Sequence, residues 1–236
     1  MRKIFTVANL SNFTPPPHPQ GIILEGQSVR LEPLDAKKHA QQLFKSNSEE
    51  GGEGNWTYLP YGPFNTVSDY SDWLNSIEGQ PDPAFFTIVR KEDERAVGVA
   101  SYLRINPNEG SIEVGHINFS PPLQRTAEAT ETMFLMMQWA FNSGYRRYEW
   151  KCNAKNIKSR KAAQRLGLSY EGVFRQASIS KGQNRDTAWF AAIDKEWQQL
   201  EAAFSDYFKS CNSNPKSLRV LTEPILVKKD NLEFSS

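Results

Sequence analysis

The chain has 236 residues, 39% of them hydrophobic, and its 28 lysines and arginines nearly balance its 27 aspartates and glutamates. This composition is typical of one well-packed domain, and the balanced charge excludes long-range attraction to nucleic acid or an anionic membrane. The two cysteines and three histidines are too few and too scattered for a disulfide framework or a zinc site. No apolar stretch has membrane-spanning length, and the first residues turn polar too soon for a secretory signal. We therefore expect a cytoplasmic protein, with the nucleus as the alternative, that is a monomer or homodimer without metal, membrane or nucleic-acid partners.

The proline run Thr14–Pro19 separates the start of the chain from its folded part. Proline cannot donate a hydrogen bond in a sheet and favours an extended backbone. We therefore expect a proline-rich extension over residues 1–24, one domain over residues 25–209 and a tail over residues 210–236. The tail contains one short apolar run, which predicts a mobile tail or a single docked strand.

A strand and two helices are predicted at the start of the domain. Residues 27–33 alternate apolar and polar side chains, as a half-buried strand does. Asp35 caps a polar helix that runs to about Ser46, and Thr66 caps a second helix that ends near Ile77.

From Pro83 onward the hydrophobic residues alternate instead of recurring at helical spacing. Three strands with short turns are predicted over residues 84–90, 96–105 and 111–119, which form an antiparallel meander. A helix, a strand, a second helix, a closing hairpin and a final helix are predicted over residues 133–141, 145–152, 156–166, 170–193 and 195–208. The strand, helix and strand in the middle predict a right-handed parallel crossover.

The stretch Gln124–Ala129, Gln-Arg-Thr-Ala-Glu-Ala, leads into the first helix of this crossover. A helix N-terminus has unsatisfied N–H groups and a positive dipole end, and small residues let a phosphate approach it. Ala127 and Ala129 are small, and Gln124 with Arg125 can add side-chain donors. The alternative is that Thr126 or Thr130 simply caps a core helix.

In this order of elements the chain resembles the GNAT acyltransferase superfamily. The stretch Gln124–Ala129 is similar to its acetyl-CoA-binding signature, Gln/Arg-x-x-Gly-x-Gly/Ala, with Ala127 in place of the first glycine. Further segments resemble the RimJ/RimL-like, ribosomal-protein-acetyltransferase-like branch: Trp56–Phe64, Ala129–Glu131, Asn156–Ser159, Leu166–Leu168, Glu171–Arg175 and Glu196–Trp197. The resemblance implies an α/β (α+β) fold with a mixed, mostly antiparallel sheet flanked by helices.

The resemblance also implies acetyl-CoA as co-substrate and no metal. In the family, the strand before the phosphate cradle hydrogen-bonds the pantetheine arm, and the start of the next helix contacts the pantetheine amide and sulfur. The residues that this implies for cofactor binding are Asn118, Phe119, Gln124, Arg125, Thr126, Ala127, Glu128, Ala129, Asn156 and Ser159.

Acetyl transfer from a thioester to an amine needs a neutral nucleophile, stabilisation of an oxyanion and a proton for the thiolate. The resemblance places the Ser159 hydroxyl near the sulfur, where it can protonate the thiolate, and Tyr170 is a second candidate acid. Glu113 can take the ammonium proton through water, although a strand glutamate is often only solvated. Asn156 and Ser159 also suit ordinary helix-start positions, and Tyr170 suits packing.

An aromatic segment, Trp56–Phe64, is broken by Pro60, Gly62 and Pro63 and predicts a loop. We expect Trp56, Tyr58, Tyr61 and Phe64 to roof the acceptor site and enclose the apolar part of an amine. The alternative is a hydrophobic plug beneath a loop.

The sequence thus predicts an acetyl-CoA-dependent N-acetyltransferase that acts by direct attack in a ternary complex. Its acceptor is a small-molecule amine or a protein N-terminus. The alternative function is a non-catalytic acyl-CoA-binding or sensing protein with a degenerate GNAT site.

Overall fold

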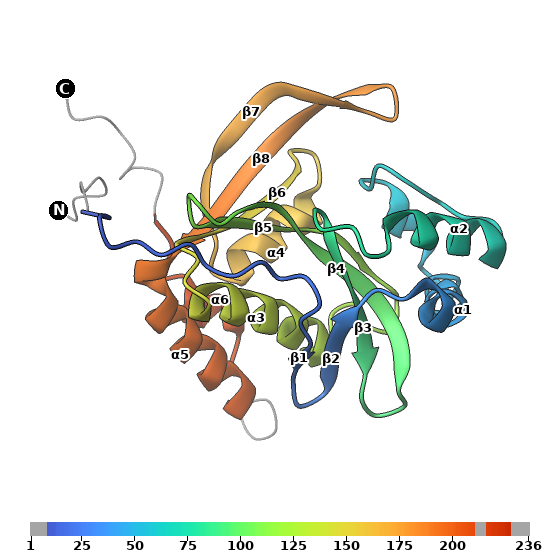
Figure 1. Ribbon diagram of the computed structural model, residues 1–236, viewed down its shortest axis with the longest axis horizontal. Coiled ribbons are helices and arrows are strands. Elements are labelled where there is room, and N and C mark those ends of the chain that lie inside the picture. Colours follow the sequence, from blue (N-terminus) through green and yellow to red (C-terminus); the bar gives the residue numbers. More distant parts are fainter. Residues whose placement is uncertain (1–8, 211–215, 228–236) are drawn as a thin grey trace.

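The computed structural model describes residues 9–210 and 216–227, and its centre is an eight-stranded sheet with the strand order β1-β2-β3-β4-β5-β6-β8-β7 (Figure 1). The strands are β1 (Leu24–Glu25), β2 (Val29–Pro33), β3 (Ala84–Arg90), β4 (Arg95–Asn106), β5 (Ser111–Phe119), β6 (Arg147–Asn153), β7 (Ser169–Ser180) and β8 (Gln183–Ile193). The helices are α1 (Ala36–Asn47), η1 (Glu53–Trp56, a 3₁₀ turn), α2 (Val67–Ile77), α3 (Ala127–Asn142), α4 (Ile157–Arg165), α5 (Asp194–Ser210) and α6 (Leu218–Thr222).

The expected strand pairings are confirmed. The strands β3, β4 and β5 form the antiparallel meander, and β5 pairs with β6 in parallel across the α3 crossover. Every other pairing in the sheet is antiparallel. The sheet is therefore mixed and mostly antiparallel, as the sequence predicts.

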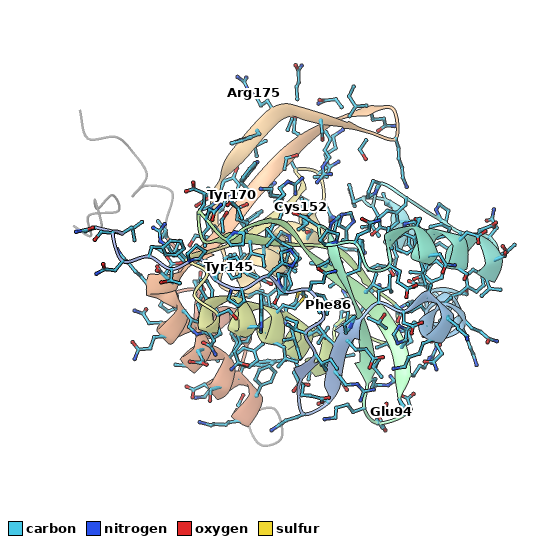
Figure 2. All side chains as sticks on the ribbon, in the orientation of Figure 1. Phe86, Glu94, Tyr145, Cys152, Tyr170 and Arg175 are labelled. Carbon is cyan, nitrogen blue, oxygen red and sulfur yellow. The ribbon has the colours of Figure 1, made fainter. Side chains whose placement is uncertain are left out.

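Two hydrophobic clusters cover opposite faces of the sheet. The larger joins α3, α4 and α5 to the sheet and includes Met136, Phe190 and Phe204, while the smaller joins α1 and α2 to β3 and β4 around Leu43 and Phe85. Phe86, Tyr145 and Cys152, labelled in Figure 2, belong to the larger cluster. The helices α1 and α2 cover only one end of their face, and η1 contacts β5, so the strands β6 and β8 extend beyond these helices (Figure 1).

Local caps explain where the predicted helices begin. The side chains of Asp35, Thr66 and Thr126 accept the N–H groups of Lys38, Asp69 and Ala129, respectively. Each cap satisfies one N–H group that the first helical turn leaves without a partner. Among the described residues, no helix is both long and apolar enough to cross a membrane.

The two ends of the chain differ from the expectations. The short strand β1 was not predicted, and Pro17 in the extension accepts a hydrogen bond from Tyr145, so residues 9–24 lie against the domain. The described part of the tail is not a strand: it forms α6, whose Leu218 is buried and whose Thr222 hydroxyl donates to the carbonyl of Arg165. The rest of the predicted tail, including Cys211, lies outside the described residues.

Candidate active site

The strands β5 and β6 diverge in the middle of the sheet. Their parallel pairing ends at Val114 and Trp150, but β5 continues to Phe119 and β6 continues to Asn153. The backbone of β5 beyond Val114 therefore has β4 on one side and no paired strand on the other. Such an edge can pair with an extended ligand as a further strand would.

A β-bulge shapes this open segment of β5. Ser101 pairs with Gly115 and Val99 pairs with Asn118, so two residues of β5 stand opposite one residue of β4. The bulged residue His116 has φ 50° and its ring stacks on Tyr61 from the aromatic loop. The bulge thus turns His116 toward the α1–α2 side of the sheet.

Asn118 is the clearest sign that the open segment accommodates a ligand. Its side chain is 1% exposed, and neither the amide oxygen nor the amide nitrogen has a hydrogen-bond partner within the described parts of the chain. A buried amide without partners is costly, and native proteins rarely leave one unsatisfied. Asn118 lies opposite Val99 of the smaller cluster, so its side chain faces the α1–α2 side of the sheet, next to the open edge of β5.

The predicted phosphate cradle lies at the end of β5, where α3 begins at Ala127. Thr126 is the N-cap and takes the N–H of Ala129, which confirms the capping alternative for this threonine. The N–H groups of Ala127 and Glu128 have no acceptor in residues 9–210 or 216–227, as expected for a first helical turn. Capping and phosphate binding are therefore compatible here.

Alanine replaces glycine in the cradle without backbone strain. Ala127 is exposed and is the first residue of α3, with no left-handed conformation, so it needs none of the freedom of glycine. The left-handed residue is Arg125, with φ 66°. The turn therefore places its strain two residues earlier, at an exposed arginine.

Gln124 shapes this turn instead of extending into the cradle. Its side-chain amide donates to the Phe119 carbonyl at 2.8 Å and to the Asn55 side chain at 2.7 Å, and its N–H bonds the Ser120 carbonyl. The side-chain amide and the backbone N–H group of Gln124 thus already have acceptors within the protein. The geometry gives no support to the expectation that Gln124 binds phosphate.

The start of α4 brings Ser159 beside the open segment of the sheet. Asn156 is the N-cap and its side chain accepts the N–H of Ser159 at 3.1 Å. The indole of Trp150, from the last paired position of β6, donates to the Ser159 hydroxyl oxygen at 2.9 Å. Because this oxygen already accepts a hydrogen bond, the hydroxyl proton is left to donate elsewhere.

Glu113 lies on the opposite face, one residue before β5 and β6 separate. It is 3% exposed and forms ion pairs of 2.8 Å with Lys151 and with Arg104. Burial raises the pKa of Glu113, and the two cations act against that rise. Glu113 is therefore a buried, positioned carboxylate and not a solvated strand residue.

Tyr170 packs at the start of β7. Its ring centroid lies 5.3 Å from that of Phe190 and 5.6 Å from the guanidinium carbon of Arg160, and no hydrogen bond of its hydroxyl is found in the described residues. Figure 2 shows Tyr170 at the centre of the molecule, beneath the arch of the β7–β8 hairpin. These contacts match the packing alternative and give Tyr170 no defined proton partner.

In the aromatic loop, Trp56 packs into the smaller hydrophobic cluster, whereas Tyr61 contacts the β5 bulge. Trp56 is 6% exposed and its ring packs edge-on to Phe64 and Tyr70. The Tyr61 hydroxyl, by contrast, lies 3.1 Å from Nδ1 of His116. Tyr58 is partly exposed and its hydroxyl donates to the Lys155 carbonyl.

Lys181 at the tip of the β7–β8 hairpin joins this loop to the rest of the site. Its ammonium donates to the carbonyls of Trp56 at 2.9 Å and Gly62 at 3.1 Å. The hairpin therefore arches over the uncovered face of the sheet and meets the aromatic loop on the far side (Figure 1). The roles of Lys181, Trp150 and Lys151 leave no local signal in the sequence, because each contacts a residue on another element.

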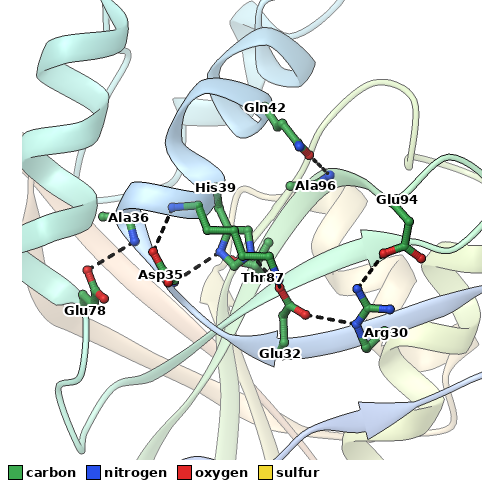
Figure 3. Close-up of polar contacts among 11 residues, drawn as sticks. Arg30, Glu32, Asp35, Ala36, His39, Gln42, Glu78, Thr87, Glu94 and Ala96 are labelled. Atoms are coloured by element: carbon green, nitrogen blue, oxygen red, sulfur yellow. Dashed lines mark hydrogen bonds and ion pairs between the residues drawn. The ribbon is translucent and has the colours of Figure 1, made fainter.

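A second polar cluster, shown in Figure 3, has the residue types of a hydrolytic triad, but its hydroxyl group is not accessible to a substrate. His39 Nε2 lies 2.7 Å from Glu32, and His39 Nδ1 lies 3.0 Å from the Thr87 hydroxyl. Thr87 is 0% exposed, so no substrate reaches its hydroxyl. The cluster instead holds α1 against β2 and β3.

No group of three metal-ligating side chains is found in the described residues. The donor set fits acetyl-CoA instead: helix N–H groups suit its pyrophosphate, and the open backbone edge of β5 suits its amide-bearing arm.

Comparison with known proteins agrees with this geometry. The model of the acetyltransferase (GNAT) domain matches residues 28–169. A crystal structure of a GCN5-related N-acetyltransferase from Brucella melitensis is 41% identical with a TM-score of 0.86, over 90% of this chain and 99% of that chain. An uncharacterized N-acetyltransferase, YnaD, from Bacillus subtilis is 26% identical over 141 residues, which are 59% of this chain and 81% of the relative.

A crystal structure of RimL, a ribosomal L7/L12 alpha-N-protein acetyltransferase, has a TM-score of 0.61 at 19% identity, over 73% of this chain and 94% of that chain. At that identity the likeness shows a shared fold and does not distinguish the RimJ/RimL-like branch. The domain match covers more than half of the 236 residues. The protein belongs to the acetyltransferase (GNAT) domain family.

Proposed function

We propose that this protein is an acetyl-CoA-dependent N-acetyltransferase that acetylates a primary amine, on a small molecule or a protein N-terminus, by direct attack in a ternary complex. The observation that carries the proposal is the open edge of β5 beyond Val114, which leads to the N–H groups of Ala127 and Glu128 that have no acceptor in the described residues. Bound acetyl-CoA supplies the activated acyl group as a thioester.

In this proposal the cofactor and the amine approach the sheet from opposite sides. The N–H groups of Ala127 and Glu128 bind pyrophosphate, with Arg125 beside them, and the edge of β5 over Asn118 and Phe119 holds the pantetheine arm. A free backbone N–H of the same edge polarises the thioester carbonyl. The amine enters from the opposite face, under the aromatic loop.

Proton transfers follow from the positions of Glu113 and Ser159. The carboxylate of Glu113 accepts the ammonium proton through water, and burial favours this because it makes the group more basic. The Ser159 hydroxyl, whose oxygen is held by Trp150, donates a proton to the departing thiolate as the carbon–sulfur bond breaks and the new carbon–nitrogen bond forms. No covalent acyl-enzyme is needed, since the buried Cys152 has a pKa that burial raises.

Calorimetric titration with acetyl-CoA, CoA and dephospho-CoA at fixed salt tests the cofactor site first. We expect binding of acetyl-CoA and CoA and weaker binding of dephospho-CoA. An amine screen that follows thiol release then tests transfer. Binding without transfer to any amine would favour the acyl-CoA sensor instead, and no binding of any of the three would reject both functions.

A further inference from the structure

The face of the sheet that α1 and α2 leave uncovered is rich in charge, and most of this charge is internally balanced. Side chains of β6 alternate, so Tyr148, Trp150 and Cys152 point into the large cluster and the residues between them point to the uncovered face. Six ionised side chains at this face pair with one another: Glu113 with Arg104 and Lys151, Glu149 with Lys151 and Arg147, and Glu171 with Arg147.

Arg185 is a cation that this network does not include. It lies on β8, two residues before Thr187 and therefore nearer the tip of the hairpin. Thr187 pairs with Asn153 at the end of β6. In the residues that the structure describes, its guanidinium forms no ion pair, and its Nε–H group is buried without a hydrogen-bond acceptor. A buried guanidinium donor without an acceptor is a site for an anion from outside the chain.

Arg185 faces the acceptor side of the sheet and not the cofactor phosphates. On β8, Ala188 and Phe190 belong to the large cluster beneath α3 and α4, so the alternating residues Arg185 and Trp189 point to the other face. The ring of Trp189 lies 3.8 Å from the ammonium of Lys151 on that face. The N-termini of α3 and α4, which suit the cofactor, lie on the opposite side.

The position of Arg185 is also close to the reacting centre. Its charge contributes to lowering the pKa of His116 on the β5 bulge, after the larger effect of burial and beside that of Arg104. Asp82 acts in the opposite direction on His116, but its carboxylate is engaged by the N–H groups of Arg104 and Ile105. Arg104 and Arg185 thus both bring positive charge near His116 on this side of the sheet.

A second buried donor lies along the same strand. The indole N–H of Trp189 has no acceptor among the described residues. It is four residues from Arg185, about 13 Å at the rise of an extended strand. A ligand that lies along β8 thus meets two unsatisfied donors on one face.

We propose that the acceptor amine carries a carboxylate, and that Arg185 binds this carboxylate so that the amine is aimed at the gap between β5 and β6. A single planar guanidinium suits a carboxylate because the two form paired hydrogen bonds. The inference rests on the proposed function and narrows its acceptor to amino acids, related amino carboxylates and peptides with a nearby acidic group.

The test uses matched amines that differ only in a carboxylate or carboxamide group, such as 4-aminobutyrate with 4-aminobutyramide, and amino acids and dipeptides with their amides. Binding is measured by calorimetry in the presence of CoA, and transfer by thiol release with acetyl-CoA. We expect the wild type to favour the carboxylate member of at least one pair by about tenfold or more in Kd and in kcat/KM. Arg185→Gln removes this preference through Kd and KM, and Arg185→Lys restores part of it.

Arg175→Gln is the matched control, because Arg175 is an exposed arginine of the same hairpin and lies at the top of its arch (Figure 2). This variant should keep the carboxylate preference. Acetyl-CoA titration and thermal unfolding establish that each variant is folded.

The outcomes separate the two proposals. Transfer with no carboxylate preference, a preference that survives in Arg185→Gln, or binding of neither member of any pair would overturn the role of Arg185. Carboxylate-selective binding that depends on Arg185 without any transfer would support this inference and contradict the proposed catalysis.

Discussion

Ser159 combines a local role with a tertiary one. Its N–H completes the cap of α4, and its hydroxyl oxygen accepts the indole proton of Trp150. Sequence spacing alone leaves it an ordinary helix-start residue. The contact with Trp150 distinguishes it, since it fixes the hydroxyl at the point where β6 leaves β5.

Ser159→Ala should lower kcat by about 100-fold with little change in acetyl-CoA affinity, because it removes a proton donor and no binding contact to the pyrophosphate. Rapid-quench or thiol-release kinetics, with calorimetry for affinity, measure both quantities. Ser143→Ala, at the far end of α3, is the control and should have wild-type kinetics. An unchanged kcat in Ser159→Ala would remove Ser159 from the mechanism.

Ala127→Glu should abolish acetyl-CoA binding in calorimetry. The added carboxylate lies at the first residue of α3, where it fills the space for pyrophosphate and repels it. Ala127→Gly is the matched variant and should bind as the wild type does, because the position needs no positive φ. Undiminished binding by Ala127→Glu would show that the cradle is only a helix start.

At the scale of elements, the β7–β8 hairpin was predicted as a closing hairpin from its two alternating runs. Its position over the uncovered face was not predictable, because it depends on contacts between Lys181 and a loop 119 or more residues earlier. The β5 bulge was also missed. Its register shift arises from the pairing of β5 with β4 and leaves no distinct pattern in the sequence.

Lys181→Ala should raise KM for the amine several-fold and leave acetyl-CoA affinity unchanged. The change removes both hydrogen bonds between the hairpin tip and the aromatic loop, each worth about 1 kcal/mol or somewhat more for a charged donor. Steady-state kinetics with an accepted amine provide the measurement. Lys158→Ala, an exposed lysine of α4, is the control, and equal KM values in the two variants would argue against an acceptor-side role of the hairpin.

At the scale of the whole molecule, the cluster in Figure 3 links folding stability to pH. Burial raises the pKa of Glu32, but hydrogen bonds from Lys38, Arg30 and His39 outweigh it and hold the pKa at about 2. Burial lowers the pKa of His39, against the opposing effect of Glu32, so His39 is neutral in the folded protein. Both groups therefore favour folding above the pKa values of the unfolded chain.

The free energy of unfolding should fall as the pH drops, first below about 6.5, where His39 takes up a proton in the unfolded chain but not in the folded protein, and then between about 4.5 and 2, where the same holds for Glu32. The contribution of Glu32 is on the order of 3 kcal/mol at neutral pH. Urea unfolding of the wild type and Glu32→Gln at pH 7 and pH 3 measures it, and the difference between the two proteins should shrink at pH 3. Exposed Glu50→Gln is the control, and a constant difference for Glu32→Gln would contradict the linkage.

The sequence by itself determined the order of the main strands and helices, the caps of α1 to α4 and the point where α3 begins. These features depend on near neighbours in the chain: hydrophobic period, a capping side chain such as Thr126, and small residues at a helix start. The tertiary structure alone decided that two cations pair with Glu113, that Trp150 holds Ser159, and that the Nε–H group of Arg185 has no acceptor within the described parts of the chain. Burial and pairing of charge arise only when distant strands pack together, so no local pattern encodes them.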